Sequence, residues 1–178
     1  MTTTASTPSK HITYGTVAGI SMVVVMLILH ITGLAYANKI YNNIAWIPFL
    51  MIMILNAISY SNSLDNYVTF GQVFGNSFKA AMVTTLIIIA YSVLTIFVFP
   101  EMKEKAMGLV QDEMMKQGKV DEATMDKAMS ITRNFYPVIL ISSSVFTGLF
   151  YGALFALIGA LVAKKKGNNP HPNLDALK

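Results

Sequence analysis

Residues 137–163 read PVILISSSVFTGLFYGALFALIGALVA, and this stretch decides the fold class of the chain. It contains no Asp, Glu, Lys or Arg over its whole length. About 20 consecutive apolar residues cross the hydrocarbon core of a bilayer as a helix. The stretch therefore predicts a transmembrane helix, and the basic residues that directly follow it predict the membrane boundary: Lys164, Lys165 and Lys166.

The composition of the whole chain agrees with a membrane protein. Of its 178 residues, 54% are hydrophobic and only 12% are charged, whereas soluble domains average about 25% charged residues. The absence of cysteine excludes disulfides and thiolate metal sites. Basic residues outside the charged segment flank apolar runs, which is typical of membrane orientation and not of nucleic-acid binding.

Three further apolar runs predict membrane spans. The second run has Trp46 near its start and Tyr60 at its end, as expected for residues at the two membrane interfaces, and Pro100 follows the third. We expect an all-α integral membrane protein with a polar tail (1–11), a basic tail (164–178) and four transmembrane helices at 12–36, 44–60, 80–99 and 137–163.

The first span has a second interpretation. Ala35-Tyr36-Ala37 follows a long apolar run and has the Ala-x-Ala pattern of a signal-peptidase site. Cleavage there would remove the first span from the mature protein. Residues 61–79, between the second and third runs, are mixed in polarity and are expected to form a connector.

A charged segment (100–136) separates the third and fourth spans. It contains seven acidic and six basic residues, and its apolar residues recur at the i, i+3, i+7 spacing of a helix face. Gly118 is typical of a helix end and Asp121 of a helix start. The pattern predicts an amphipathic helical hairpin outside the hydrocarbon, with a possible docking face for a protein partner formed by Met107, Val110, Met114, Ala128, Ile131 and Phe135.

The hairpin also holds half of the methionines of the chain. Thioethers bind Cu(I), but no Cys or His accompanies them in this segment. Adaptable apolar packing is the favoured interpretation of these residues, and no metal or other cofactor is expected.

Small residues recur every four positions along the fourth span. This spacing places them on one helix face, where they allow a second helix to approach closely in lipid. The partner helix can belong to the same chain or to another one. The predicted packing seam consists of Ser144, Gly148, Gly152, Ala156 and Ala160, and Gly15 and Gly19 form a smaller pair on the first span.

Few polar residues interrupt the spans. The four considered as candidates for transport are His30, Asn56, Thr84 and Thr85. Intramembrane ionisable residues often mark transport pathways, which makes His30 the candidate transport residue. A structural role near the end of its span is the favoured alternative.

Several motifs resemble a known family: YGTVAGI at residue 14, FGQVFGNSFKAAM at 70, FPEMKEK at 99, QGKVDEATMDKAM at 117 and GLFYGALFALIGALVAKK at 148. Together they resemble the four-span membrane proteins of Bacteroidota called domain of unknown function family 4199. The resemblance covers residues 14–166. It implies a bacterial inner-membrane location and implies no activity, site residue or cofactor.

No catalytic constellation or phosphate-binding loop is present in the sequence. We therefore expect a non-enzymatic structural or accessory component that contacts the bilayer and a protein partner or a second copy of itself. A small-solute or ion carrier, either monomeric or dimeric, is the alternative. A lipid-modifying enzyme that uses Glu101 at the membrane interface is a weaker third hypothesis.

The three lysines after the fourth span predict cytoplasmic termini and a periplasmic hairpin. Single cysteine reporters at Ser9, Lys119 and Asn168 test this in a chain that has no native cysteine. We expect an impermeant thiol reagent added to intact cells to label only the reporter at Lys119. Labelling at both termini with protection at Lys119 would show the inverted topology.

Overall fold

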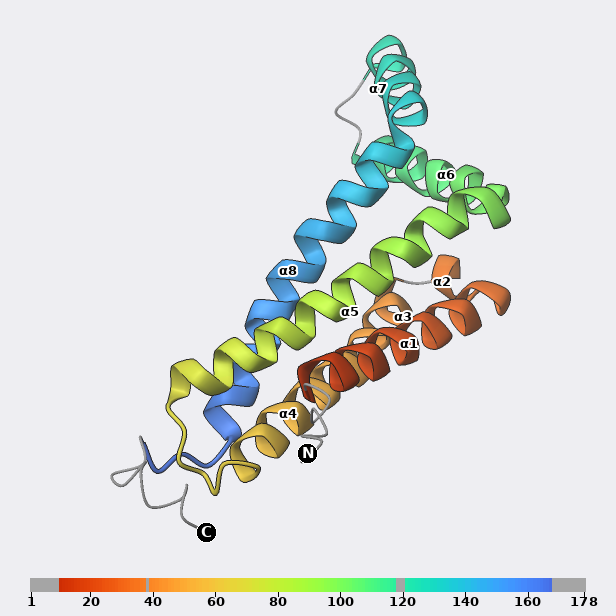
Figure 1. Cartoon of the computed structure of the whole chain (residues 1–178). Coiled ribbons are helices and arrows are strands. Elements are labelled where there is room, and N and C mark those ends of the chain that lie inside the picture. Colours follow the sequence, from red (N-terminus) through yellow and green to blue (C-terminus); the bar gives the residue numbers. More distant parts are fainter. Residues whose placement is uncertain (1–9, 38, 118–120, 168–178) are drawn as a thin grey trace, which may run out of the picture.

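The computed structural model describes residues 10–37, 39–117 and 121–167, and the described chain is helical apart from short connections (Figure 1). The helices are α1 (Lys10–Ile31), α2 (Leu34–Ala37), α3 (Lys39–Ile44), α4 (Trp46–Asn62), α5 (Phe70–Val98), α6 (Pro100–Gln117), α7 (Glu122–Asn134) and α8 (Tyr136–Val162).

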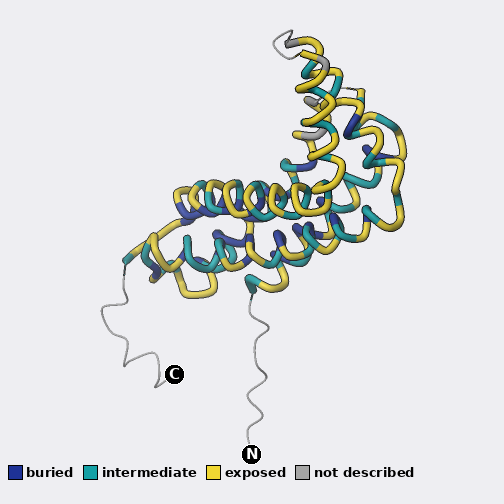
Figure 2. Tube along the Cα trace, turned by 90° about the horizontal axis from the view of Figure 1, so that it is seen from above, coloured by how far each residue is buried: buried dark blue, intermediate teal, exposed yellow. Residues whose placement is uncertain are grey.

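The helices α1, α4, α5 and α8 pack side by side as a bundle. Three of them, α1, α5 and α8, are long and apolar enough to cross a membrane. Their outward faces carry large apolar side chains, and Figure 2 shows buried residues along the inner sides of the bundle. Phe97 and Phe146, for example, are 78% and 74% exposed. Apolar surface on this scale marks contact with lipid, and the predicted all-α membrane fold is confirmed at this level.

The second predicted span, 44–60, corresponds to a shorter apolar helix that is shifted by two residues, and its crossing of the membrane stays a prediction. The helix there, α4, has 17 residues and is shorter than the three candidate spans. At about 1.5 Å per residue it is roughly 26 Å long, against a hydrocarbon core of about 30 Å. The predicted first span, 12–36, is too long, because α1 ends at Ile31 and Gly33 turns the chain with a φ of 75°.

The third predicted span, 80–99, began too late. Helix α5 starts at Phe70 because Thr69 caps it. The Thr69 hydroxyl accepts a hydrogen bond from the Gln72 backbone N–H, and the Gln72 side chain accepts one from the Thr69 N–H. This capping box satisfies two backbone donors at the helix start, so most of the expected connector is helix. The fourth span agrees with its prediction to within one residue at each end.

The charged segment forms the two predicted helices, α6 and α7. The Asp121 carboxylate accepts a hydrogen bond from the Thr124 N–H at 3.3 Å and caps α7 as expected. An ion pair between Arg133 and Glu104, at 3.2 Å, joins the two helices. Figures 1 and 2 show α7 projecting away from the bundle. Gly118, the predicted helix end, lies outside the described residues.

Opposite the hairpin, the four bundle helices end together. The Lys10 ammonium donates to the Ser59 carbonyl at 3.1 Å, which ties α1 to α4. The Ser61 hydroxyl donates to the Lys164 carbonyl, and the Lys166 N–H donates to the Asn66 carbonyl at 2.7 Å. We call this end of the bundle the terminal end and the opposite end the hairpin end.

Helix α4 does not extend to the hairpin end of the bundle. Trp46, its first residue, stacks on Tyr151 of α8 with ring centroids 4.4 Å apart. Tyr151 lies 15 residues after the start of α8, so α8 continues beyond α4 by about 22 Å. Toward the hairpin the bundle therefore continues with α1, α5 and α8, with the short helices α2 and α3 packed against α1, and this arrangement leaves space above Trp46.

Small residues hold the long helices together. A methyl group on Gly148 would lie 2.7 Å from the Thr85 methyl carbon, and one on Gly152 would lie 2.9 Å from the Ala81 methyl. A methyl group on Gly15 would overlap the Ala80 carbonyl oxygen. Such close approach of backbones drives helix association in lipid, because burying large apolar side chains there gains little over lipid contact.

We predict that Gly15→Ala destabilises the protein by about 1–3 kcal/mol, the usual cost of overpacking a tight interior. The backbone carbonyl that it meets cannot rotate away as a side chain can. The matched control is Gly75→Ala in α5, where the added methyl meets no atom within 4 Å and alanine favours the helix by up to about 1 kcal/mol. Unfolding by SDS titration measures both variants. Equal stability of the two would show that α1 and α5 are not in close contact.

Candidate functional site

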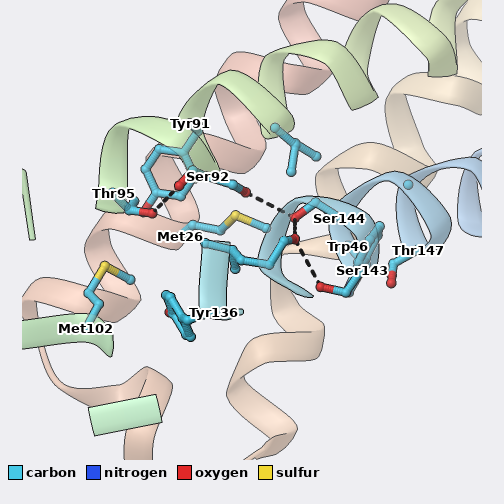
Figure 3. A pocket seen from close by; sticks show the side chains of 13 residues that line it. Met26, Trp46, Tyr91, Ser92, Thr95, Met102, Tyr136, Ser143, Ser144 and Thr147 are labelled. Atoms are coloured by element: carbon cyan, nitrogen blue, oxygen red, sulfur yellow. Dashed lines mark hydrogen bonds between the residues drawn. The ribbon is translucent and has the colours of Figure 1, made fainter. Parts of the chain in front are cut away.

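The space above Trp46 is a cavity of about 290 Å³ (Figure 3). Its walls come from α1, α4, α5 and α8, and Met102 of α6 closes it on the hairpin side. The lining residues are Met26, Trp46, Ile88, Tyr91, Ser92, Thr95, Met102, Tyr136, Leu140, Ser143, Ser144, Thr147 and Gly148.

Hydroxyl groups line one side of the cavity. The Ser144 hydroxyl donates to the Leu140 carbonyl at 2.7 Å and lies 3.1 Å from the Ser92 hydroxyl. Ser143 donates to the same carbonyl at 3.0 Å, and Thr95 donates to the Ser92 carbonyl at 2.8 Å. These hydroxyls belong to α5 and α8, whose close packing through Gly148 brings them together.

Aromatic rings and thioethers form the rest of the wall. Trp46 and Tyr91 lie beside Met26, while Tyr136 and Met102 approach from the hairpin side. Apolar walls with a few convergent polar groups are typical of small-molecule sites. The cavity is therefore amphipathic, with its hydroxyls concentrated on α5 and α8.

A second cavity, of about 260 Å³, adjoins the first. The two share Met26, Trp46, Tyr91 and Met102, and the second one is otherwise lined by Leu29, His30, Ala35 and Ala45. Its lining is more apolar, since the serine and threonine hydroxyls belong to the first cavity. The two cavities together provide a more polar region and a more apolar region, and the Trp46 indole lines both.

His30 lies at the edge of the second cavity and is 7% exposed. Its Nδ1 lies 2.8 Å from the Tyr36 hydroxyl, and its Nε2 lies 3.8 Å from a Glu101 carboxylate oxygen. Burial raises the pKa of Tyr36, and the nearby Tyr136, Glu101 and Tyr91 raise it further. The phenol therefore stays protonated at neutral pH. The contacts of His30 join α1, α2 and the first turn of α6, which fits a structural role at the base of the hairpin.

A smaller cavity of about 180 Å³ lies at the junction of α5, α6 and α8. Thr95, Met102 and Tyr136 line both this cavity and the first one. Lys103 lines its outer part, with its ammonium 5.9 Å from the centroid of the Tyr136 ring. The Lys103 ammonium thus places a positive charge at the hairpin side of the main cavity.

The predicted seam residues all lie on the side of α8 that faces the bundle. Ser144 contacts Ser92 of α5, Gly148 and Gly152 face Thr85 and Ala81 of α5, and Ala156 and Ala160 are fully buried. Within this chain the seam therefore packs against α5 and the bundle core. Nearby, Gly159 approaches α4, where a methyl group on it would lie 3.0 Å from the Met53 carbonyl oxygen.

The predicted docking face is divided. Met107 is only 3% exposed and packs inside the protein, so it is not available to an external partner in this structure. Met114 and Ala128 are half-buried, whereas Val110, Ile131 and Phe135 are exposed.

The three predicted topology anchors lie together at the terminal end. The Lys165 ammonium donates to the Ala160 and Ala163 carbonyls at 2.6 Å, which satisfies acceptors at the end of α8. The Lys166 ammonium lies 5.1 Å from the centroid of the Tyr67 ring. The Lys164 carbonyl accepts the hydrogen bond from Ser61.

The other intramembrane polar residues have structural partners. The Asn56 amide donates to the Ser77 hydroxyl at 3.3 Å. The Thr84 hydroxyl donates to the Gly15 carbonyl at 2.9 Å, and the Thr85 hydroxyl donates to the Ala81 carbonyl at 2.9 Å. These groups join helices or bond within one helix, and none of them lines the three cavities described above.

The sequence interpretation assigned Ser144 and Gly148 to the packing seam and named His30 of the second cavity, but it missed the other cavity residues. It assigned Trp46 to the membrane interface and gave no role to Tyr91 or Tyr136. One signal was available. Ser143, Ser144 and Thr147 interrupt an otherwise apolar span at helical spacing, and Ser92 and Thr95 do the same on the third span. Only the structure, in which α4 is shorter than α5 and α8, reveals that these two groups of hydroxyl side chains face an open space.

The fold and its long apolar helices define an integral membrane protein of the multi-span helical class. The chain belongs to the family described as "Protein of unknown function (DUF4199)", whose model matches residues 13–165. This match confirms the resemblance seen in the sequence. Neither a curated protein nor a solved structure matches the chain significantly.

Proposed function

We propose that this protein binds a small amphiphilic molecule at the hairpin end of its bundle and acts as a membrane carrier or binding component, without catalysing a reaction. One observation carries the proposal: α4 begins beside Tyr151, and the volume that it leaves is an amphipathic cavity of about 290 Å³. In lipid, a helix that stops short leaves its neighbours' polar groups without a packing partner, and a bound amphiphile would supply one.

The lining of the cavities favours an amphiphile over an ion. None of the residues lining the main cavity carries a full charge at neutral pH, and an unpaired ion in an apolar site is costly. The adjoining cavity beside Leu29 and Ala45 offers room for an apolar chain. His30 lies at the edge of this second cavity, and its ring nitrogens face Tyr36 and Glu101.

One specific observation still supports the accessory-component hypothesis. Leu109, Val110 and Met115 on α6 expose apolar surface on the hairpin, and so do Ile131 and Phe135. A protein partner that covers this surface is compatible with ligand binding below it. The small-residue seam supports this hypothesis less, since α5 of the same chain already covers it.

The enzyme hypothesis is the least supported of the three. Glu101 is half exposed and contacts a buried histidine that is itself bonded to Tyr36, an arrangement that holds α6 against α1. The proposed location remains the bacterial inner membrane. Cytoplasmic termini are proposed because Lys10 and the lysines after α8 gather at one end of the bundle.

We predict that protein extracted with its native lipids retains a small molecule in one-to-one ratio, detectable by native mass spectrometry. Leu140→Trp places a larger side chain in the cavity wall and should reduce the retained fraction at least about tenfold, since overlap with a ligand commonly costs more than the 1.4 kcal/mol of a tenfold change.

The matched control is Leu157→Trp, on the same helix, because Leu157 is exposed on the outer surface and does not line the cavity. It should retain the molecule as the parent does. A parent protein that carries no small molecule, or a molecule retained equally by both variants, would contradict the proposed site.

A further inference from the structure

The serine and Thr95 hydroxyl protons around the cavity already take part in hydrogen bonds within the protein. Ser144 has a single proton, which it donates to the Leu140 carbonyl at 2.7 Å. With the Ser144 proton on the Leu140 carbonyl, we assign Ser92, 3.1 Å away, as the donor in the contact between the two serines. Ser143 donates to the same Leu140 carbonyl, and Thr95 donates to the Ser92 carbonyl.

These bonds leave oxygen lone pairs at the cavity surface. A hydroxyl has one donor and two acceptor positions. The donor of each of these four side chains is used in a hydrogen bond within the protein, and each side chain can still accept one. The remaining polar groups of the lining, the Thr147, Tyr91 and Tyr136 hydroxyls, can donate as well as accept. The α5–α8 wall is therefore rich in acceptors and holds few available donors.

The lining disfavours both a negatively charged and a positively charged ligand head. An anion held against Ser92, Ser143 and Ser144 would face oxygen lone pairs, because the protons of these hydroxyls are donated within the wall. A cation would lack a carboxylate, since the lining has none, and it would approach the Lys103 ammonium at the hairpin side. An alcohol group meets both requirements, because it donates to the serine oxygens and accepts from Thr147 or a tyrosine.

We propose that the amphiphile bound in this cavity has an uncharged head that carries hydroxyl groups, as in a monoalkyl glycerol or a sugar-headed lipid. This inference rests on the proposed function, because it specifies the ligand of the same cavity. The head lies against Ser92, Ser143 and Ser144, and the apolar chain lies in the adjoining cavity beside Leu29 and Ala45.

Trp46 makes the proposal measurable, because it is the single tryptophan of the chain and lines both cavities. The protein is placed in phosphatidylcholine nanodiscs, whose head groups have no hydrogen-bond donors, and is titrated with 1-O-decylglycerol. We expect a saturable change in Trp46 fluorescence as a function of the probe's mole fraction in the bilayer.

Three probes with the same chain test the head group. The 2,3-di-O-methyl ether of decylglycerol keeps the oxygens and lacks the donors, and we expect it to bind at least about tenfold more weakly, because a cavity built to accept hydrogen bonds is left unpaired. Decyl sulfate and decyltrimethylammonium test the two charges, and both should bind more weakly than decylglycerol.

A pair of serine variants links the preference to the cavity wall. Ser143→Ala removes an acceptor at the rim and should reduce the preference for decylglycerol over its methyl ether severalfold. Ser21→Ala is the matched control, because Ser21 also donates to a backbone carbonyl but lines none of the three cavities. Its preference should equal that of the parent.

The outcomes separate the two proposals. Equal binding of decylglycerol and its methyl ether, or tighter binding of a charged probe, would overturn the hydroxyl-head inference and leave an amphiphile site standing. A Trp46 signal that saturates with none of the four probes would overturn the inference together with the proposed function.

Discussion

Trp46, the first residue of α4, packs against Tyr151 of α8, and the space at the hairpin end depends on the position of this contact. The terminal end is fixed by Lys10, Ser61 and the residues after α8, which join α1, α4, the end of α8 and the loop that leads into α5. With one end aligned, any difference in helix length appears at the other end. The 17 residues of α4 and the 27 of α8 therefore leave a gap above the indole.

The same residues that hold the long helices together also shape that gap. Close approach at Gly148 and Gly152 brings α8 onto α5 without large side chains between them. Toward the hairpin the seam continues as Ser144 against Ser92, and the small side chains there leave volume and carry hydroxyls. One periodic pattern in α8 thus gives tight packing at its centre and a polar cavity wall near its start.

The sequence predicted the helical membrane fold well because apolar length is a strong signal, and Lys164–Lys166 marked the end of α8 correctly. It failed where boundaries depend on single contacts. The Thr69–Gln72 capping box moved the start of α5, and Gly33 ended α1 early. The small residues predicted a seam on α8, but the periodicity could not say that α5 is the partner. Cavities arise from unequal helix lengths, which residue patterns alone do not reveal, so the site was found only in three dimensions.

The most direct test of this account is an experimental structure of the protein in a lipid nanodisc, with the density above Trp46 as the measurement. The account predicts that α4 begins at Trp46, that its indole stacks on Tyr151, and that elongated non-protein density lies between Met26 and Ser144. A helix α4 that continues to the hairpin end, or side chains that fill the space, would contradict it.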